Sequence, residues 1–288
     1  MIKESGISVI ISTYNSEKWL EKVLWSYQAQ DFKNFELVIA DDGSDKATED
    51  LINYIKLFVD YEIIHIWQKD EGFQKSRILN KAIMACNFDY ILMSDGDCIV
   101  RKDFLSAHAK KIKKGFFLSG GYYKLPLTIS KAISNEDILQ QSCFNIKWLR
   151  SKGLKSSFKN NKITAKTFKS EFLNNVTPTK ASWNGHNSSG WKEDILAVNG
   201  FDERMQYGGQ DRELGERLAN LGIKSKQIRY SAICLHLDHP RGYCNQKSID
   251  KNKSIRKETR KTKKTYTVFG IKKHDNNSIF KKEKKEHA

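Results

Sequence analysis

Residues 8–44 read SVIISTYNSEKWLEKVLWSYQAQDFKNFELVIADDGS and contain one complete strand–helix–strand unit. The β-branched run at 7–12 has the composition of a strand that is buried on both faces of a parallel sheet. Asn15 and Ser16 can each cap a helix, and the apolar side chains after them recur at helical spacing. Residues 35–40 predict a second strand, so the unit predicts two parallel strands joined by a helix.

The same alternation continues over the first hundred residues. Helices are expected at 48–58 and 76–86, and strands at 62–67 and 90–93. Repeated units of this kind predict an α/β fold with a mostly parallel, Rossmann-like sheet flanked by helices. Ligands of such sheets bind beyond the carboxyl ends of the strands. The acidic clusters DDGS and SDGD both follow strands directly, so we expect them to line one crevice.

The rest of the chain gives weaker signals. Patterns along it predict a strand with a glycine break at 116–123, helices at 133–149, 193–198 and 212–221, and a short strand at 231–235. Residues 151–180 are polar, lysine-rich and aperiodic, which favours a mobile loop or a small subdomain. No segment of the core is expected beyond residue 243.

Composition excludes several classes of protein. With 288 residues, of which 39% are hydrophobic, the chain can fill a substantial core. Its five cysteines are scattered and show no CxxC spacing, which favours free thiols in a reducing compartment over disulfides or structural zinc. No apolar run approaches the length of a membrane span, and the start MIKESGIS lacks a signal-peptide stretch. We therefore expect a cytoplasmic protein.

The positive charge is concentrated near the end of the chain. Of the net charge of +16, residues 247–288 carry +10, from 15 Lys and Arg against 5 Asp and Glu. This predicts a basic tail that is either solvated or in contact with polyanions or anionic lipid headgroups, which would place the protein at the inner face of a membrane. A nucleic-acid binder would spread the charge over a folded face, so no nucleic acid is expected as a partner.

The strand-end carboxylates carry the clearest chemistry. Asp95 and Asp97 lie one residue apart and point to the same side of an extended chain. Such a pair suits Mn²⁺ or Mg²⁺, although Asp-x-Asp also occurs in ordinary turns. Asp42 is either a turn residue or an acceptor for an N–H or O–H of a base or ribose. His236 and His239 are either structural or complete the coordination of the cation.

Asp211 is a candidate general base. It follows Gly208 and Gly209 at the start of an expected helix, where it either caps the helix or removes a proton from a substrate. The preceding residue, Gln210, has an amide that can hydrogen-bond a hydroxyl but cannot take its proton.

Four segments together resemble the inverting family 2 glycosyltransferases of GT-A fold. They are residues 8–44, residues 70–83 (DEGFQKSRILNKAI), residues 90–108 (YILMSDGDCIVRKDFLSAH), and residues 185–223, which begin GHNSSGWKEDILAVNGFDE. The last segment looks like the galactosyltransferase-type half of chondroitin-polymerase-like and bacterial polysaccharide glycosyltransferases. The resemblance covers 7–243 with a gap over 122–182. It implies one catalytic domain made of a nucleotide-sugar-binding half (1–121), a variable acceptor-side segment (122–182) and an acceptor and catalytic half (183–246), followed by the basic tail (247–288).

The resemblance also implies roles for single residues. On the donor side, Asp42 would bind the uracil edge of a UDP-sugar, beside Thr13 and Tyr14. Arg77 and Asn80 would face the base and diphosphate. Asp95 would reach the ribose or the metal, and the metal ligands would be Asp97 and His236, with His239 as the second choice. Asp211 falls where the family keeps its base. Gln210, Trp183 and Trp191 are acceptor-side candidates, the last two as sugar-stacking rings or as ordinary core or rim aromatics.

These assignments predict inverting transfer of a sugar from a UDP-sugar to a hydroxyl of a saccharide or glycolipid acceptor, in bacterial surface polysaccharide or glycolipid synthesis. Mn²⁺ or Mg²⁺ would stabilise the leaving diphosphate. A sugar nucleotidyltransferase is an alternative, but its glycine-rich basic loop is replaced here by Ser-Thr-Tyr-Asn at 12–15. A polyanion-binding module that uses the basic tail is a second alternative, and it predicts salt-sensitive binding without turnover.

Overall fold

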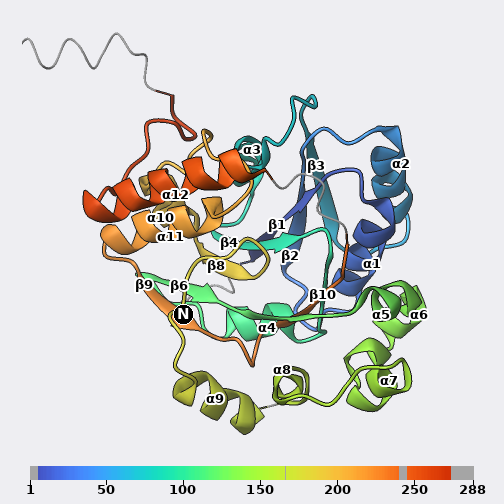
Figure 1. The fold of residues 1–288 in the computed structure, drawn as a ribbon. Helices are drawn as coiled ribbons and strands as arrows, with labels where there is room; N and C mark the ends of the chain where they lie inside the picture. Colours follow the sequence, from blue (N-terminus) through green and yellow to red (C-terminus); the bar gives the residue numbers. More distant parts are fainter. Residues whose placement is uncertain (1–5, 166, 240–244, 274–288) are drawn as a thin grey trace, which may run out of the picture.

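The computed structural model describes residues 6–165, 167–239 and 245–273. At its centre lies a seven-stranded sheet (Figure 1). β1 (Ile7–Thr13) pairs in parallel with β2 (Phe35–Asp41) and with β4 (Tyr90–Asp95), and β3 (Glu62–Trp67) pairs in parallel with β2. The four strands expected in this half of the chain are therefore confirmed.

The other half of the sheet is mixed. β8 (Ser188–Trp191) lies antiparallel to β4, and it is followed by β6 (Phe116–Ser119) and β9 (Lys224–Gln227). The complete order is β3-β2-β1-β4-β8-β6-β9. The α/β architecture with a mostly parallel sheet is thus confirmed.

A second sheet of three strands lies beside the main one. It contains β5 (Cys98–Val100), β10 (Ile233–His236) and β7 (Gly121–Lys124), with β10 in the middle. The single strand expected at 116–123 is divided at its glycines, and its two parts, β6 and β7, join different sheets. β10 matters for function because it brings its last residue, His236, next to Cys98 at the end of the β4–β5 turn.

Helices cover both faces of the main sheet. Val9 and Ile11 of β1 face one apolar core, and Ile10 faces the other, so both faces of the strand are buried. The first core is covered by α1 (Glu17–Gln28), α2 (Lys46–Ile55) and α4 (Phe104–Ala109); the second is covered by α3 (Lys75–Ala85), α10 (Lys192–Ala197) and α11 (Gln210–Asn220). Among the described residues, no helix combines the length and the apolar character that crossing a membrane requires.

The single helix expected at 133–149 is wrong. α5 (Leu127–Ala132) ends before this region, and two short helices and one 3₁₀ turn occupy it: α6 (Asn135–Leu139), η1 (Ser142–Phe144) and α7 (Ile146–Ser151). A capping box between Ser134 and Asp137 starts α6, and Gln141 then takes a left-handed conformation with φ of 60°. Asn145 caps the next helix through its side chain. Polar residues that favour caps therefore interrupt the apolar periodicity.

Of the two alternatives for 151–180, a mobile loop or a small subdomain, the described part of the segment contains helices and so fits the second. Residues 158–164 form η2 (Phe158–Asn160) and α8 (Asn161–Thr164), and α9 (Thr167–Val176) follows. α7, α8 and α9 lie together at one end of the molecule, outside the main sheet (Figure 1).

The basic tail expected at 247–288 begins with a packed helix. α12 (Gln246–Lys261) lies against α11 in Figure 1 and buries four residues, Ser248, Asn252, Ile255 and Thr259. The buried face carries one apolar residue and three polar ones, so a search for apolar periodicity could not find it. Farther along, Thr267 is buried and donates its hydroxyl to Asp202. The expectation that no core segment follows residue 243 is thereby overturned; residues 274–288 lie outside the described part.

Candidate active site

One pocket of about 990 Å³ opens at the carboxyl edge of the parallel strands. Both acidic clusters contribute to it, through Asp42 after β2 and through Asp95 and Asp97 at and after β4. The expectation that they line one crevice is confirmed. Segments from the second half of the chain close the pocket: residues 185–186, the start of α11, the end of β10 and part of α12.

Asp42 is held in the wall of the pocket by two hydrogen bonds. Gln68 donates from Nε2 to one carboxylate oxygen at 2.7 Å, and the backbone N–H of Gln74 donates to the other at 2.8 Å. Burial raises the pKa of Asp42 although both hydrogen bonds oppose this. The carboxylate is therefore fixed in orientation and still lines the pocket, where its remaining lone pairs can accept from a ligand.

Thr13 and Tyr14 line the same wall. The Thr13 hydroxyl is buried and makes no hydrogen bond within the described residues. Tyr14 is half-exposed and donates its hydroxyl to Asp70 at 2.9 Å, and this bond is the main reason why the pKa of Tyr14 is raised. The half-exposed ring of Tyr14 gives this wall a planar surface that suits a nucleoside.

Arg77 and Asn80 are absent from the described lining of the pocket. Arg77 pairs with Glu71 and reaches Gln68, the residue that orients Asp42. Asn80 is buried: its amide nitrogen donates to the carbonyl of Phe201, and its side-chain oxygen accepts the N–H of the same residue. The expectation that Asn80 faces a base or diphosphate is wrong in this structure, because its side chain is used to hold the chain at residue 201.

Asp95 has a cationic partner that the sequence analysis did not single out. Lys75, the first residue of α3, places its ammonium group 2.6 Å from Asp95, and the Ser12 hydroxyl donates to the same carboxylate oxygen. Burial disfavours the charged form of Asp95, but Lys75 and the neighbouring His186 outweigh it and hold the pKa of this carboxyl well below its usual range. Burial likewise opposes the charged form of Lys75, yet Asp95 and Asp97 raise its pKa. This ion pair is therefore fully charged at neutral pH.

Asp97 points toward two histidines. The Nε2 atoms of His239 and His236 lie 2.8 and 3.6 Å from Asp97 Oδ2. His236 places Nδ1 2.9 Å from the carbonyl oxygen of Leu237. Since a carbonyl oxygen can only accept, Nδ1 carries the hydrogen and Nε2 is left as the atom with a lone pair.

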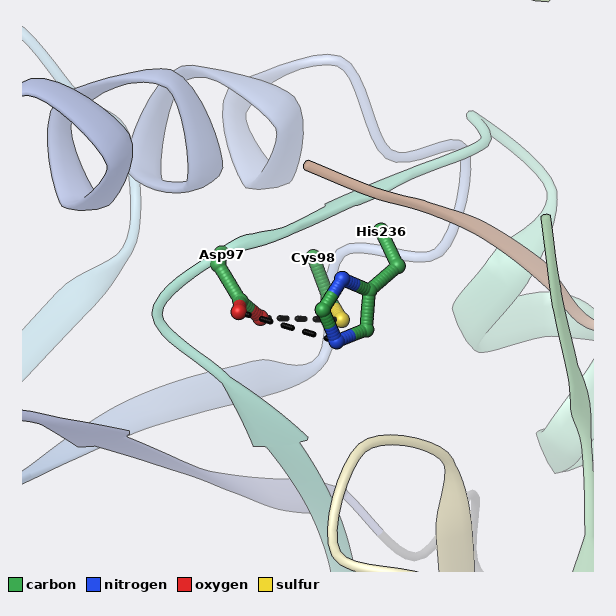
Figure 2. Close-up of side chains that lie close together, drawn as sticks. All are labelled: Asp97, Cys98 and His236. Carbon is green, nitrogen blue, oxygen red and sulfur yellow. Dashed lines mark hydrogen bonds and ion pairs between the residues drawn. The ribbon is translucent and has the colours of Figure 1, made fainter. Parts of the chain in front are cut away.

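This arrangement fits a divalent cation. Asp97, His236 and Cys98 each offer one ligand atom, and these atoms all lie within 4.8 Å of one another (Figure 2). Cys98 is fully buried, and burial raises the pKa of its thiol, so the sulfur stays protonated and ligates poorly. The remaining set of one carboxylate and two imidazoles suits Mn²⁺ better than a cation that demands oxygen ligands alone.

Asp211 enters the pocket from the first turn of α11. Gly208 and Gly209 precede it with φ of 107° and 87°, values that side-chain-bearing residues rarely adopt. The backbone N–H of Gly185 donates to the Asp211 carboxylate at 3.1 Å.

His186 lies on the same wall and was also missed by the sequence analysis. Burial lowers its pKa to about 4, although Asp95 and Asp211 oppose the shift, so the imidazole is neutral at neutral pH. Its only sequence signal is its place in the GHN stretch, beside residues expected on the acceptor side.

Of the three acceptor-side candidates, Gln210 belongs to the described lining of the pocket, whereas Trp183 and Trp191 do not. The side-chain oxygen of Gln210 accepts the N–H of Gly208. Trp183 is fully buried and packs against Phe117, and Trp191 is buried with its ring between Tyr90 and the ammonium group of Lys114. Both tryptophans are core or rim aromatics, so neither ring is placed to stack on a sugar.

α12 contributes side chains to the pocket, although its residues were expected to belong to a basic tail. Ile249, Lys253 and Arg256 line the pocket beside Arg212 of α11. Arg256 pairs with Glu216 at 2.6 Å, so its position is fixed by α11.

Comparison with known sequences supports the resemblance. The family model described as Glycosyl transferase family 2 matches residues 8–164. The glycosyltransferase GlyA of Streptococcus pneumoniae is 30% identical over 112 residues, which cover 39% of this chain and 16% of that protein. The chondroitin synthase of Escherichia coli is 23% identical over 251 residues, which cover 82% of this chain and 35% of that protein. The chain thus spans well under half the length of these two relatives.

Solved structures show the same fold at low sequence identity. The mannosyltransferase PcManGT from Pyrobaculum calidifontis, in complex with GDP-Man and Mn²⁺, aligns with a TM-score of 0.56 at 17% identity, over 84% of this chain and 59% of its own. S. aureus TarS 1-349, in complex with UDP-GlcNAc, aligns with a TM-score of 0.52 at 16% identity, over 83% of this chain and 60% of its own.

Proposed function

The chain belongs to glycosyltransferase family 2, and on that premise we propose that it transfers a sugar from a UDP-sugar to a hydroxyl of a saccharide acceptor, with inversion at the anomeric carbon. One observation carries the proposal: Asp42, Asp97 and Asp211, from three distant parts of the chain, line one pocket. These carboxylates correspond to the three tasks of such an enzyme, which are binding the nucleoside, holding a cation and removing a proton.

The donor would lie along the strand ends. Asp42 would accept from the N–H of the base, and the ring of Tyr14 would cover the nucleoside. Lys75 would compensate phosphate charge from within its ion pair with Asp95. A donor of the UDP class is supported by the TarS complex with UDP-GlcNAc, whereas the PcManGT complex contains GDP-Man, so the fold by itself does not select the base.

Asp97, His236 and His239 would hold a divalent cation. When bound, a cation at this position would supply positive charge that stabilises the departing diphosphate. The lone pair on His236 Nε2, set by the carbonyl of Leu237, is the feature of the chain that prepares the site.

Asp211 would act as the general base. The acceptor oxygen attacks the anomeric carbon, the bond from that carbon to the diphosphate oxygen breaks, and UDP departs with the electron pair. The hydroxyl proton moves to the Asp211 carboxylate. A single displacement of this kind inverts the anomeric configuration. The product would serve polysaccharide or glycolipid synthesis, consistent with the chondroitin synthase among the relatives.

The experiment is a screen of UDP-sugars with saccharide acceptors and Mn²⁺, in which UDP release is measured and the anomeric configuration of the product is determined. Asp211→Asn keeps the shape of the side chain and removes its basicity, so we expect turnover to fall roughly 10²- to 10⁴-fold with little change in UDP affinity. Asp97→Asn should lose most of the cation-dependent UDP affinity. Asp194→Asn, on α10 and outside the described lining of the pocket, is the matched control.

The alternatives predict different products. A sugar nucleotidyltransferase would release pyrophosphate from UTP and a sugar phosphate, and a polyanion-binding module would bind in a salt-dependent way without turnover. Either result, or a retained anomeric configuration, would overturn the proposal.

A further inference from the structure

α9 has its polar side inside and its apolar side outside. The residues that it buries are Ser170 and Asn174. Phe168, Phe172 and Val176, which are spaced by four residues and so share the opposite face, are 83%, 55% and 52% exposed. An exposed apolar stripe of this kind is the reverse of a normal surface helix, which hides its apolar face.

Hydrogen bonds fix this orientation. The Asn174 side chain donates to Ser231 Oγ at 2.8 Å and accepts the N–H of Tyr230 at 2.9 Å. The backbone carbonyl of Asn174 accepts from Gln227 Nε2 at 2.6 Å. Rolling the helix to bury its phenylalanines would break these buried bonds. The apolar stripe is therefore held toward the outside.

Phe158 is a further exposed apolar side chain in the segment beside α9. It is 76% exposed and opens η2, which leads directly into α8. Lys169 of α9 donates to Asn161 of α8 at 3.0 Å, so the two segments are tied together at this end. Figure 1 shows α8 and α9 next to each other at the edge of the molecule. We call the exposed side chains of α9, Phe168, Phe172 and Val176, the phenylalanine face.

The surroundings of this face are strongly cationic. Residues 151–180 contain seven lysines and one acidic residue, Glu171, which pairs with Lys111 from outside the segment. Lys155, Lys159 and Lys169 are exposed. A second copy of the chain would bring the same lysines together and be repelled, whereas a surface of phosphate groups would be attracted.

We propose that the phenylalanine face docks on a bilayer that contains anionic phospholipids. The phenylalanine rings enter the boundary between headgroups and acyl chains, and the lysines contact the headgroup phosphates. Apolar insertion and electrostatic attraction together are the combination that holds amphipathic surfaces on membranes. The proposal concerns a surface outside the pocket and does not depend on which reaction the pocket performs. It also moves the expected membrane contact from the C-terminal segment to residues 155–165 and 167–176.

The test measures binding of the full chain to phosphatidylcholine vesicles with and without phosphatidylglycerol. The double variant Phe168→Ser, Phe172→Ser removes two exposed rings without touching the buried face of α9. We expect it to bind anionic vesicles roughly tenfold or more weakly than the wild-type chain. The matched control is Leu57→Ser, Phe58→Ser, which removes two exposed apolar side chains after α2. Deletion of 274–288 removes lysines without altering the phenylalanine face. Both controls should bind like the wild-type chain.

Direct insertion gives a second readout that does not require a destabilising change. In a Phe172→Trp variant, the additional tryptophan emission should shift to the blue when anionic vesicles are added. Several results would overturn the proposal: no binding of the wild-type chain to anionic vesicles, equal binding by the double variant, loss of binding only on deletion of 274–288, or a dimer in solution that the double variant abolishes.

Discussion

Asn252 of α12 holds the loop that leads to the proposed base. It is fully buried, and its amide nitrogen lies 3.0, 3.1 and 3.0 Å from the carbonyl oxygens of Gln206, Tyr207 and Gly208. These three residues come directly before Gly209, the N-cap of α11, and Asp211 follows in the first turn. One side chain from a different helix therefore sets the path of this loop, and Asn252→Ala is the perturbation that tests it.

The magnitude follows from the bonds that are lost. The substitution removes two N–H donors that three partly buried carbonyls share, and a fully buried unsatisfied polar group costs about 1–3 kcal/mol. Because the pocket lies beside the loop, water can reach part of the vacated space, so we expect a loss of about 2–4 kcal/mol in the free energy of unfolding. Misplacement of a catalytic group by about 1 Å can cost a hundredfold in rate. We therefore expect kcat to fall roughly 10- to 100-fold while UDP affinity stays nearly constant.

Asn220→Ala is the matched control. The Asn220 amide donates to the carbonyls of Thr259 and Lys264 at 3.1 and 2.8 Å, so it ties α11 to the end of α12 without touching the loop. Both variants should lose stability in a denaturant titration, but only Asn252→Ala should lose turnover in the UDP-release assay at saturating substrates. Equal turnover in the two variants would refute the view that Asn252 positions the loop.

Two further predictions concern the C-terminal segment and the acid response. Deletion of 245–288 should destabilise the fold severely because it removes α12, whereas deletion of 274–288 should leave turnover intact; normal thermal unfolding of the longer deletion would contradict the packing of α12. His108 is fully buried between Ser189 and Asn187, and burial lowers its pKa to about 4, although the hydrogen bond to Asn187 opposes the shift. The unfolded chain takes up this proton near pH 6.5 and the folded chain does not, so His108 should contribute a loss of about 3 kcal/mol in stability as the pH drops from 6.5 toward 4, in addition to the loss from His186, whose pKa is likewise lowered to about 4. In denaturant titrations, His108→Gln should remove the contribution of His108 and leave that of His186, and an unchanged slope would exclude His108 as a source.

The parts of the site that lie at strand ends were predictable from the sequence. β1, β2 and β4 have continuous apolar runs that end abruptly in carboxylates or turn residues, and parallel pairing brings those ends to one edge. The sequence alone therefore predicts that Asp42 and Asp97 line one crevice. His236 was harder to place because β10 belongs to a second sheet, and its pairing with β5 is a long-range contact.

Two helices that the sequence did not predict, α9 and α12, turn mainly polar residues toward the protein. α12 buries Asn252 and Thr259, and α9 buries Ser170 and Asn174, so the residues that face the protein are those that a hydrophobic pattern assigns to solvent. For Trp183 the sequence left two alternatives open, a sugar-stacking ring or an ordinary core or rim aromatic, and the ring packs in the core. Lys75 was missed because a lone lysine at a helix start resembles any solvated lysine.

Elimination of the other nearby carboxylates strengthens the proposed role of Asp211. Asp202 is buried and accepts from Arg204 and Thr267, and Glu193 pairs with Lys114 on the surface. Burial disfavours ionised Asp202, but the bonds from Arg204 outweigh it and lower its pKa, so this carboxylate is fixed as a charged structural partner.

Among the described carboxylates, those that line the pocket are Asp42, Asp70, Asp95, Asp97 and Asp211. Asp42 has both oxygens bonded by the chain, Asp70 accepts from Tyr14, and Asp95 is neutralised by Lys75. Asp97 faces two histidines, which leaves Asp211, bonded only by backbone N–H groups in the described structure, as the carboxylate suited to take a proton.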